Sequence, residues 1–127
     1  MFSHMMVGSN DIDRSKKFYD ALFAAVGGKP AMQDDKGRLI YMHNGGLFLV
    51  TKPIDGEPAT HANGATIGFA MESPEQANAW HKAGTENGGT PIEDAPGVRE
   101  GGFANLYLAY LRDPDGNKLC AMHRMAA

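Results

Sequence analysis

The sequence predicts an α+β fold in which two βαβββ modules form a curved, barrel-like mixed sheet around a cleft, with the helices outside. Two observations predict it. The order of one strand, one helix and three strands occurs twice along the 127 residues. The motif GGKP at 27–30 also returns as GGTP at 88–91, and at the same spacing Tyr19 corresponds to Trp80. A repeat of pattern at this spacing indicates a duplicated module.

The duplication also sets the expected domain organisation. A half of about 60 residues buries too little surface to be stable alone. We therefore expect a single domain over 1–127, with modules at about 1–55 and 62–127. The polar, Pro- and Gly-containing segment PIDGEPATHAN at 53–63 is expected to connect them.

The first module begins with a short strand and continues with a helix. Asp11 is a typical N-cap, and an apolar stripe with helical spacing follows it. Gly27 is expected just beyond the C-terminus of the helix. Asn44 and the glycines after it indicate a hairpin turn between two later strands. The strands of this module are expected at 2–8, 29–33, 38–43 and 46–52.

The second module repeats this order with clearer helix signals. Ser73 as N-cap, Pro74 at the first helical position and Gln76 form a capping-box pattern. Gly88 and Gly89 are expected to end this helix. Asp-Pro-Asp-Gly at 113–116 matches the residue preferences of a type I turn. The strands are expected at 65–71, 90–94, 103–111 and 117–122.

Composition excludes several classes of function. The net charge is −3 and the basic residues are scattered, which is not the pattern of a nucleic-acid-binding surface. No apolar run approaches the roughly 20 residues of a membrane span. One cysteine allows no intrachain disulfide, and the first residues do not form a signal peptide. These features predict a cytoplasmic protein without nucleic-acid or membrane partners.

The order of motifs resembles a known family. An early strand containing His4, the segment NDIDRSKKFYDALF and the late segment DPDGNKLCA are similar to the vicinal-oxygen-chelate superfamily, in which glyoxalases, bleomycin-binding proteins and extradiol dioxygenases are found. The resemblance implies a divalent metal (Ni, Zn, Fe or Mn) held by His and Glu side chains from the first and last strands of each half. Such a metal acts as a Lewis acid. The resemblance also implies a homodimer, since family members commonly pair their modules between chains.

Carrying the four ligand positions over one at a time leaves an incomplete set. His4 matches the first position, whereas the second falls on apolar residues near Phe48. The third falls on Ala65 or Thr66, and the fourth, commonly Glu, falls on Cys120. Catalytic metal sites ordinarily keep about three protein ligands. We therefore expect no cofactor and no standard metal site, with His4 and Cys120 as the only matched positions if a metal binds.

Four residues are predicted to line the cleft and bind substrate: His4, Thr66, Arg99 and Cys120. His4 either contacts a ligand or is a structural residue, and Arg99 either pairs with an anionic substrate or lies on the surface. Cys120 has three interpretations: a small buried hydrophobe, a cleft-lining residue or weak ligand, and a nucleophile. The catalytic residues stay unassigned.

Other features could contribute to the cleft. The Gly-rich segment 97–107 could act as a flap over the cleft mouth. Of Tyr107 and Tyr110, at most one can face the cleft on a regular strand, because they have opposite parity. The remaining histidines are expected on the surface or in turns: His43, His61, His81 and His123. Of these, His61 is the best candidate for a replacement ligand, and His123 is expected to face away from Cys120.

The resemblance implies a glyoxalase/bleomycin-resistance-family protein that binds or converts a small molecule in its cleft without the usual full metal site. One alternative is a metal-dependent glyoxalase-like lyase or dioxygenase with non-standard ligands. The other is a drug-sequestering binding protein. Fold alone does not decide among these activities, so the sequence leaves open whether the protein is an enzyme.

Overall fold

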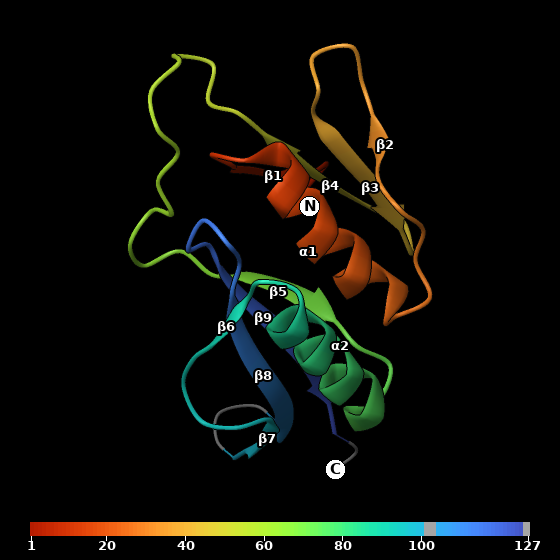
Figure 1. Ribbon diagram of the computed structural model, residues 1–127. Helices are drawn as coiled ribbons and strands as arrows, with labels where there is room; N and C mark the ends of the chain where they lie inside the picture. The colour runs from red at the N-terminus through yellow and green to blue at the C-terminus, as the bar shows by residue number, and fades with distance from the viewer. Residues whose placement is uncertain (101–103, 126–127) are drawn as a thin grey trace.

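The computed structural model describes residues 1–100 and 104–125, and these residues form two separate sheets with one helix packed on each (Figure 1). The first sheet has the strand order β1-β4-β3-β2, and the second has the order β5-β9-β8-β6, with β7 paired to β8. The elements of the first half are β1 (Met5–Gly8), α1 (Ile12–Ala24), β2 (Met32–Gln33), β3 (Leu39–His43) and β4 (Gly46–Thr51). Those of the second half are β5 (Ile67–Ala70), α2 (Pro74–Glu86), β6 (Thr90–Pro91), β7 (Gly97–Arg99), β8 (Leu106–Arg112) and β9 (Lys118–Arg124).

The two sheets repeat one topology. In each, the first strand pairs in parallel with the last strand of its half, and the other pairings are antiparallel. The strand expected at 90–94 is reduced to β6, and β7 was not predicted. Phe103, the expected start of a strand, lies outside the described residues, and β8 begins at Leu106.

Both helices start at the predicted caps. The Asp11 carboxylate accepts a hydrogen bond from the Arg14 amide at 3.0 Å, and the Ser73 hydroxyl accepts one from the Gln76 amide at 3.0 Å. The Gln76 side chain accepts from the amide of Glu72 at 2.8 Å, one residue before the position that the capping-box pattern predicts. These local bonds satisfy amides that a helix leaves unpaired at its start.

A single apolar core joins the halves. Helices α1 and α2 contact each other, and the core cluster draws aromatic side chains from both, including Phe18, Tyr19 and Trp80. The sheets themselves do not merge. The expectation of one curved, barrel-like sheet is therefore not met within one chain: the described residues form two sheets that are neither closed nor curled into a barrel. Packing through the helices holds the modules together instead.

Among the described residues, the helices cover one face of each sheet. Alternate residues of a strand point to opposite faces, and the core cluster lies on the side of the helices in both sheets. Cys120 is buried on the opposite side. We call the opposite sides the first and second open faces. The first open face contains Met6, Ile40, Met42, Leu47 and Leu49, and the second contains Leu106, Leu108, Tyr110, Cys120 and Met122.

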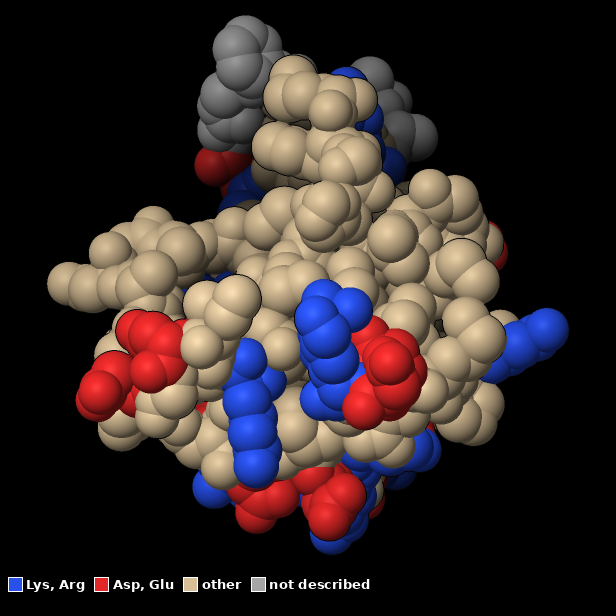
Figure 2. Space-filling view, turned by 90° about the horizontal axis from the view of Figure 1, so that it is seen from above, with Lys and Arg blue, Asp and Glu red and all other residues tan. Residues whose placement is uncertain are grey.

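The centres of both open faces are apolar, while Arg112, Lys118 and Arg124 lie toward the ends of the strands on the second open face. Met6 is 42 % exposed and Met122 is 43 % exposed. Elsewhere, the surface seen from above carries basic and acidic side chains next to one another rather than in separate patches (Figure 2). No helix in the described part of the chain is long and apolar enough to cross a membrane.

Candidate functional site

The four predicted site residues lie on two different sheets. His4 directly precedes β1 at the edge of the first sheet, where it is exposed and its ring nitrogen is 2.8 Å from the Ser3 hydroxyl. Thr66, Arg99 and Cys120 all belong to the second sheet or its margin. A single chain therefore presents the predicted site as two separate parts.

Three of these residues lie on or beside the second sheet. Cys120 in β9 lies opposite Gly68 of the parallel strand β5, and exposed Thr66 precedes that strand by one residue. Arg99 ends β7 and donates hydrogen bonds to the carbonyl oxygens of Asp94 and Ala95, both at 3.1 Å. Cys120 is 7 % exposed. The strand order of the second module therefore positions the Cys120 and Arg99 parts of the predicted site.

Tyr110 lies beside Cys120, although the sequence predicted only that at most one of Tyr107 and Tyr110 faces the cleft. It pairs directly with Cys120 across β8 and β9, whereas Tyr107 faces the helix side and donates a hydrogen bond to the Asn78 side chain at 2.7 Å. Lys118 lies over the Tyr110 ring, 5.0 Å from its centroid, and forms an ion pair with Glu93. Alternation along the strand excluded one of the two tyrosines from the face of Cys120, but only the pairing of β8 with β9 shows that it is Tyr107.

The surroundings of Cys120 and Tyr110 favour the protonated forms of the thiol and the hydroxyl. Burial raises the pKa of the Cys120 thiol, and the opposing effects of Tyr110, Lys118 and Arg99 do not reverse this. Burial also raises the pKa of the Tyr110 hydroxyl, and the adjacent Cys120 adds to the increase. A neutral thiol is a weak nucleophile. The arrangement suits hydrogen bonding to a ligand better than attack on one.

The residues at the family's metal positions do not fit a metal. Only His4 and Cys120 carry side chains that bind such metals well, whereas apolar Phe48 and Leu49 occupy the position on β4, and Ala65 and Thr66 occupy the position before β5. Over residues 1–100 and 104–125, no three His, Cys, Asp or Glu side chains come close enough to hold an ion. We therefore derive no chemistry through a metal.

The remaining histidines have other surroundings. His61, the candidate replacement ligand, packs against Gly116 in the turn before β9. A Cβ on Gly116 would lie 2.9 Å from the His61 Nδ1 atom. The ring of His123 is 3.0 Å from the Met71 carbonyl oxygen, on the side away from Cys120 as parity predicts. Burial lowers the pKa of His81. In the flap candidate 97–107, residues 97–99 form β7, and 101–103 lie outside the described residues.

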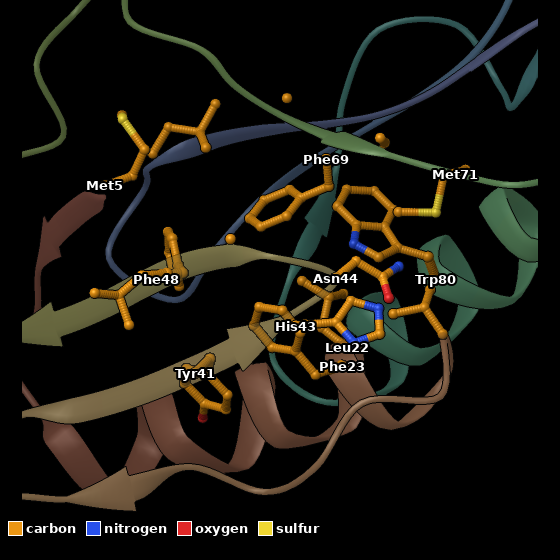
Figure 3. Close-up of a pocket in the computed structure, with 16 residues that line it drawn as sticks. Met5, Leu22, Phe23, Tyr41, His43, Asn44, Phe48, Phe69, Met71 and Trp80 are labelled. Atoms are coloured by element: carbon orange, nitrogen blue, oxygen red, sulfur yellow. The ribbon is translucent and has the colours of Figure 1, made fainter. Parts of the chain in front are cut away.

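A pocket of about 270 Å³ lies on the helix-covered side, between the modules (Figure 3). Its walls come from both halves, including Phe23 and Phe48 from the first and Phe69 and Trp80 from the second. It contains none of the four predicted site residues. Sequence reasoning missed this pocket, because its walls come from residues that individually read as core.

Comparison with known proteins agrees with this architecture. The family model described as glyoxalase/bleomycin resistance protein/dioxygenase superfamily matches residues 1–121. A crystal structure of a glyoxalase/bleomycin resistance protein from Albidiferax ferrireducens T118 is 57 % identical, with a TM-score of 0.94 over 98 % of this chain and 99 % of that one. No curated protein matches.

More distant structures show the same fold. A hypothetical protein from S. aureus has a TM-score of 0.75 at 18 % identity, over 97 % of this chain and 93 % of that one. A glyoxalase/bleomycin resistance protein/dioxygenase family enzyme from Burkholderia phytofirmans PsJN has a TM-score of 0.72 at 16 % identity, over 97 % and 98 %. The full-length family match and the 57 % identical structure establish that this chain belongs to the glyoxalase/bleomycin resistance protein/dioxygenase (vicinal-oxygen-chelate) superfamily.

Proposed function

We propose that the protein binds a small molecule in a cleft between two copies of the chain, and that binding does not depend on the full metal site typical of the family. In this arrangement the first open face of one copy lies across from the second open face of the other. The observation that carries the proposal is the uncovered apolar surface on both faces, with Met6 and Met122 each more than two-fifths exposed.

Symmetry supports the pairing. Each chain carries one face of each kind, so a two-fold dimer covers all four faces and closes the assembly. Strands β1 and β5 are at the edges of their sheets, where a strand of another chain can pair. Such pairing would extend each sheet into the neighbouring copy and produce the curved, barrel-like sheet that one chain lacks.

The same pairing would assemble the separated site. His4 of one copy would enter the cleft from one side, while Thr66, Arg99 and Cys120 of the other copy would enter from the opposite side. Apolar walls with a few polar groups are typical of small-molecule sites. The guanidinium of Arg99 favours a ligand with an anionic group, and the raised pKa of the Cys120 thiol favours binding over covalent chemistry.

The first half of the test concerns the dimer. We expect the native chain to sediment as a dimer, and Met6→Asp or Met122→Asp to produce monomers, because each places a charge on an open face. The matched control is Ile54→Asp, since Ile54 is fully exposed in the connector and lies on neither face. A native chain that sediments at its monomer mass of 13.6 kDa would contradict the proposal.

The second half concerns the ligand. Chelator-treated protein is screened by thermal shift against bleomycin and against the glutathione adduct of a 2-oxoaldehyde. We expect one probe to stabilise the native dimer without added metal, and Arg99→Ala to weaken an anionic probe selectively. Stabilisation that appears only after adding Ni²⁺, Zn²⁺, Fe²⁺ or Mn²⁺, together with turnover of the adduct, would establish the metal-dependent lyase alternative instead.

A further inference from the structure

We propose that the pocket between the modules is a second binding site, and that it takes one uncharged, planar aromatic molecule of one or two rings that accepts a hydrogen bond from the Trp80 indole. This site is distinct from the proposed cleft between copies. The cleft would use the open faces of the sheets, whereas the aromatic walls of the pocket belong to the core or pack against it on the helix side. Only its rim reaches the first open face, at Leu47.

The pocket walls are aromatic rings at contact spacing. The Phe69 ring lies 5.5 Å from that of Phe48 at an interplanar angle of 68°, and 6.0 Å from that of Phe23 at 86°. It also lies 6.2 Å from the Trp80 ring. Figure 3 shows these rings arranged around the pocket, with Met5 at one end and Trp80 at the other. These rings already pack against one another, so a ligand would contact the ring surfaces that face the pocket, and aromatic rings pair well with such surfaces.

The volume sets the size of the ligand. An engineered apolar cavity of about 150 Å³ in another protein accepts benzene. The pocket here is partly open and has a volume of about 270 Å³. The space therefore suits a molecule of one or two fused rings.

The polar groups of the pocket are few and specific. The Tyr41 hydroxyl is already used, because it donates to the Asp20 carboxylate at 2.8 Å, so Tyr41 offers only its ring. The side-chain hydrogen bonds among the described residues include none from the Trp80 indole nitrogen. That nitrogen is also not among sealed, unpaired polar atoms, of which the described residues have none. Trp80 is 1 % exposed, so a ligand would reach its indole N–H through the pocket that it lines.

Charge is excluded from the ligand by the same walls. None of the residues that line the pocket is Asp, Glu, Lys or Arg. An ion that entered would lose its hydration without gaining a partner charge, which is costly. His43 and Asn44 supply the other polar side chains, and Figure 3 shows both on the same side of the pocket. The ligand is therefore expected to be neutral, with one acceptor placed toward Trp80.

Trp80 makes the proposal directly measurable, because it is the only tryptophan in the chain. Its single indole N–H signal in a ¹⁵N-correlated NMR spectrum is followed while quinoline, naphthalene and 2-naphthoate are added. We expect quinoline, whose ring nitrogen is an acceptor, to shift the signal saturably and downfield. Naphthalene should shift it less, and anionic 2-naphthoate should leave it unchanged. An indole signal that quinoline does not move overturns the proposal, and equal shifts from quinoline and naphthalene overturn the assigned hydrogen bond.

Neighbouring methionines provide a matched pair of variants. Met5 and Met6 are 38 % and 42 % exposed, but Met5 lines the pocket and Met6 lies on the first open face. We expect Met5→Phe to fill the pocket and weaken quinoline binding at least tenfold, and Met6→Phe to leave it within twofold. Val26→Phe, at another part of the lining, is the second filling variant should Met5→Phe not fold. Unchanged quinoline affinity in a folded filling variant overturns the proposal, whatever the outcome for the dimer cleft.

Discussion

One tyrosine–aspartate hydrogen bond joins helix α1 to β3 of the first sheet, another joins it to the turn between β8 and β9, and the two bonds differ in their surroundings. In the first module, the Tyr41 hydroxyl donates to Asp20 at 2.8 Å, and the Asp20 carboxylate also pairs with Lys16 near the surface. Between the modules, the Tyr19 hydroxyl donates to Asp113 at 2.6 Å, where Asp113 is only 4 % exposed. One bond is partly open to water and the other is sealed.

The difference shows what the Asp-Pro-Asp-Gly-Asn turn does. The Asp113 carboxylate also accepts from the Asn117 side chain at 2.8 Å and from the amides of Asp115 and Asn117 at 2.9 Å. Asp115 in turn accepts from Arg14 of α1 at 2.9 Å. The turn is therefore the polar joint between α1 and the second module, and its resemblance to the family is explained by structure rather than by chemistry on a substrate.

Replacing each aspartate by alanine should give the largest difference in stability between the two bonds. We expect Asp113→Ala to lower the free energy of unfolding by about 3 to 5 kcal/mol, because it leaves buried Tyr19 and Asn117 groups without a partner. Asp20→Ala should cost about 1 kcal/mol, since the Asp20 side chain is 25 % exposed and its removal opens a path for water to the Tyr41 hydroxyl. Urea unfolding at pH 7 measures both. Equal losses would mean that the buried Tyr19–Asp113 bond contributes no more to stability than the partly exposed Tyr41–Asp20 bond.

The paired glycines allow a second contrast at equivalent positions of the repeat. A Cβ on Gly89 would lie 2.5 Å from a Phe18 ring carbon of α1 and 2.8 Å from the Gly84 carbonyl oxygen. A Cβ on Gly28 would meet nothing closer than 3.1 Å. We expect Gly89→Ala to destabilise the protein by about 1 to 3 kcal/mol through overpacking, and Gly28→Ala by clearly less.

Thermal or urea unfolding of these two alanine variants is the measurement. Neither glycine has a positive φ, so the comparison reports contact rather than backbone strain. A larger loss for Gly28→Ala would show that α1 is packed more tightly against its own module than against the second one.

Local features of the fold were predictable from the sequence, and contacts between distant segments were not. The caps at Asp11 and Ser73 depend on residues within one helical turn, so their pattern identified both helix starts. The Asn44–Gly45 turn was equally local, with φ values of 48° and 81°. By contrast, the Tyr19–Asp113 bond joins residues that are 94 positions apart, and no local pattern specifies it.

The candidate sites show the same division. Parity correctly placed His123 away from Cys120 and separated Tyr107 from Tyr110, because side chains alternate along any regular strand. The ligation role considered for His61 depended on where the connector packs, and it packs on the turn at Gly116. That the sheets stay separate in one chain also depends on packing between modules, which sequence periodicity does not encode.

The smallest expected effect is the pH dependence of stability. It distinguishes the two aspartates best, because their contributions to stability should change with pH in opposite directions. Burial tends to raise the pKa of Asp20, but hydrogen bonds from Lys16, the Ala31 amide and Tyr41 lower it overall. Its stabilising contribution is present above the ordinary aspartate pKa of about 4 and is lost as pH falls through the lower folded value. Burial raises the pKa of Asp113, despite the hydrogen bonds that it accepts. The part of its contribution that depends on protonation is therefore complete below about pH 4 and is lost as pH rises through the higher folded value, while its hydrogen bonds persist.

Urea unfolding of Asp20→Asn and Asp113→Asn between pH 7 and pH 3.5 measures this difference. As pH falls, the stability advantage of the native chain over Asp20→Asn should shrink, because the native chain loses the ionised Asp20 interactions that the variant never had. Over the same range, its stability relative to Asp113→Asn should rise, since protonation removes the cost of a buried charge. Two profiles with the same slope would mean that the sealed carboxylate is stabilised as an ion by its hydrogen bonds, as the open one is.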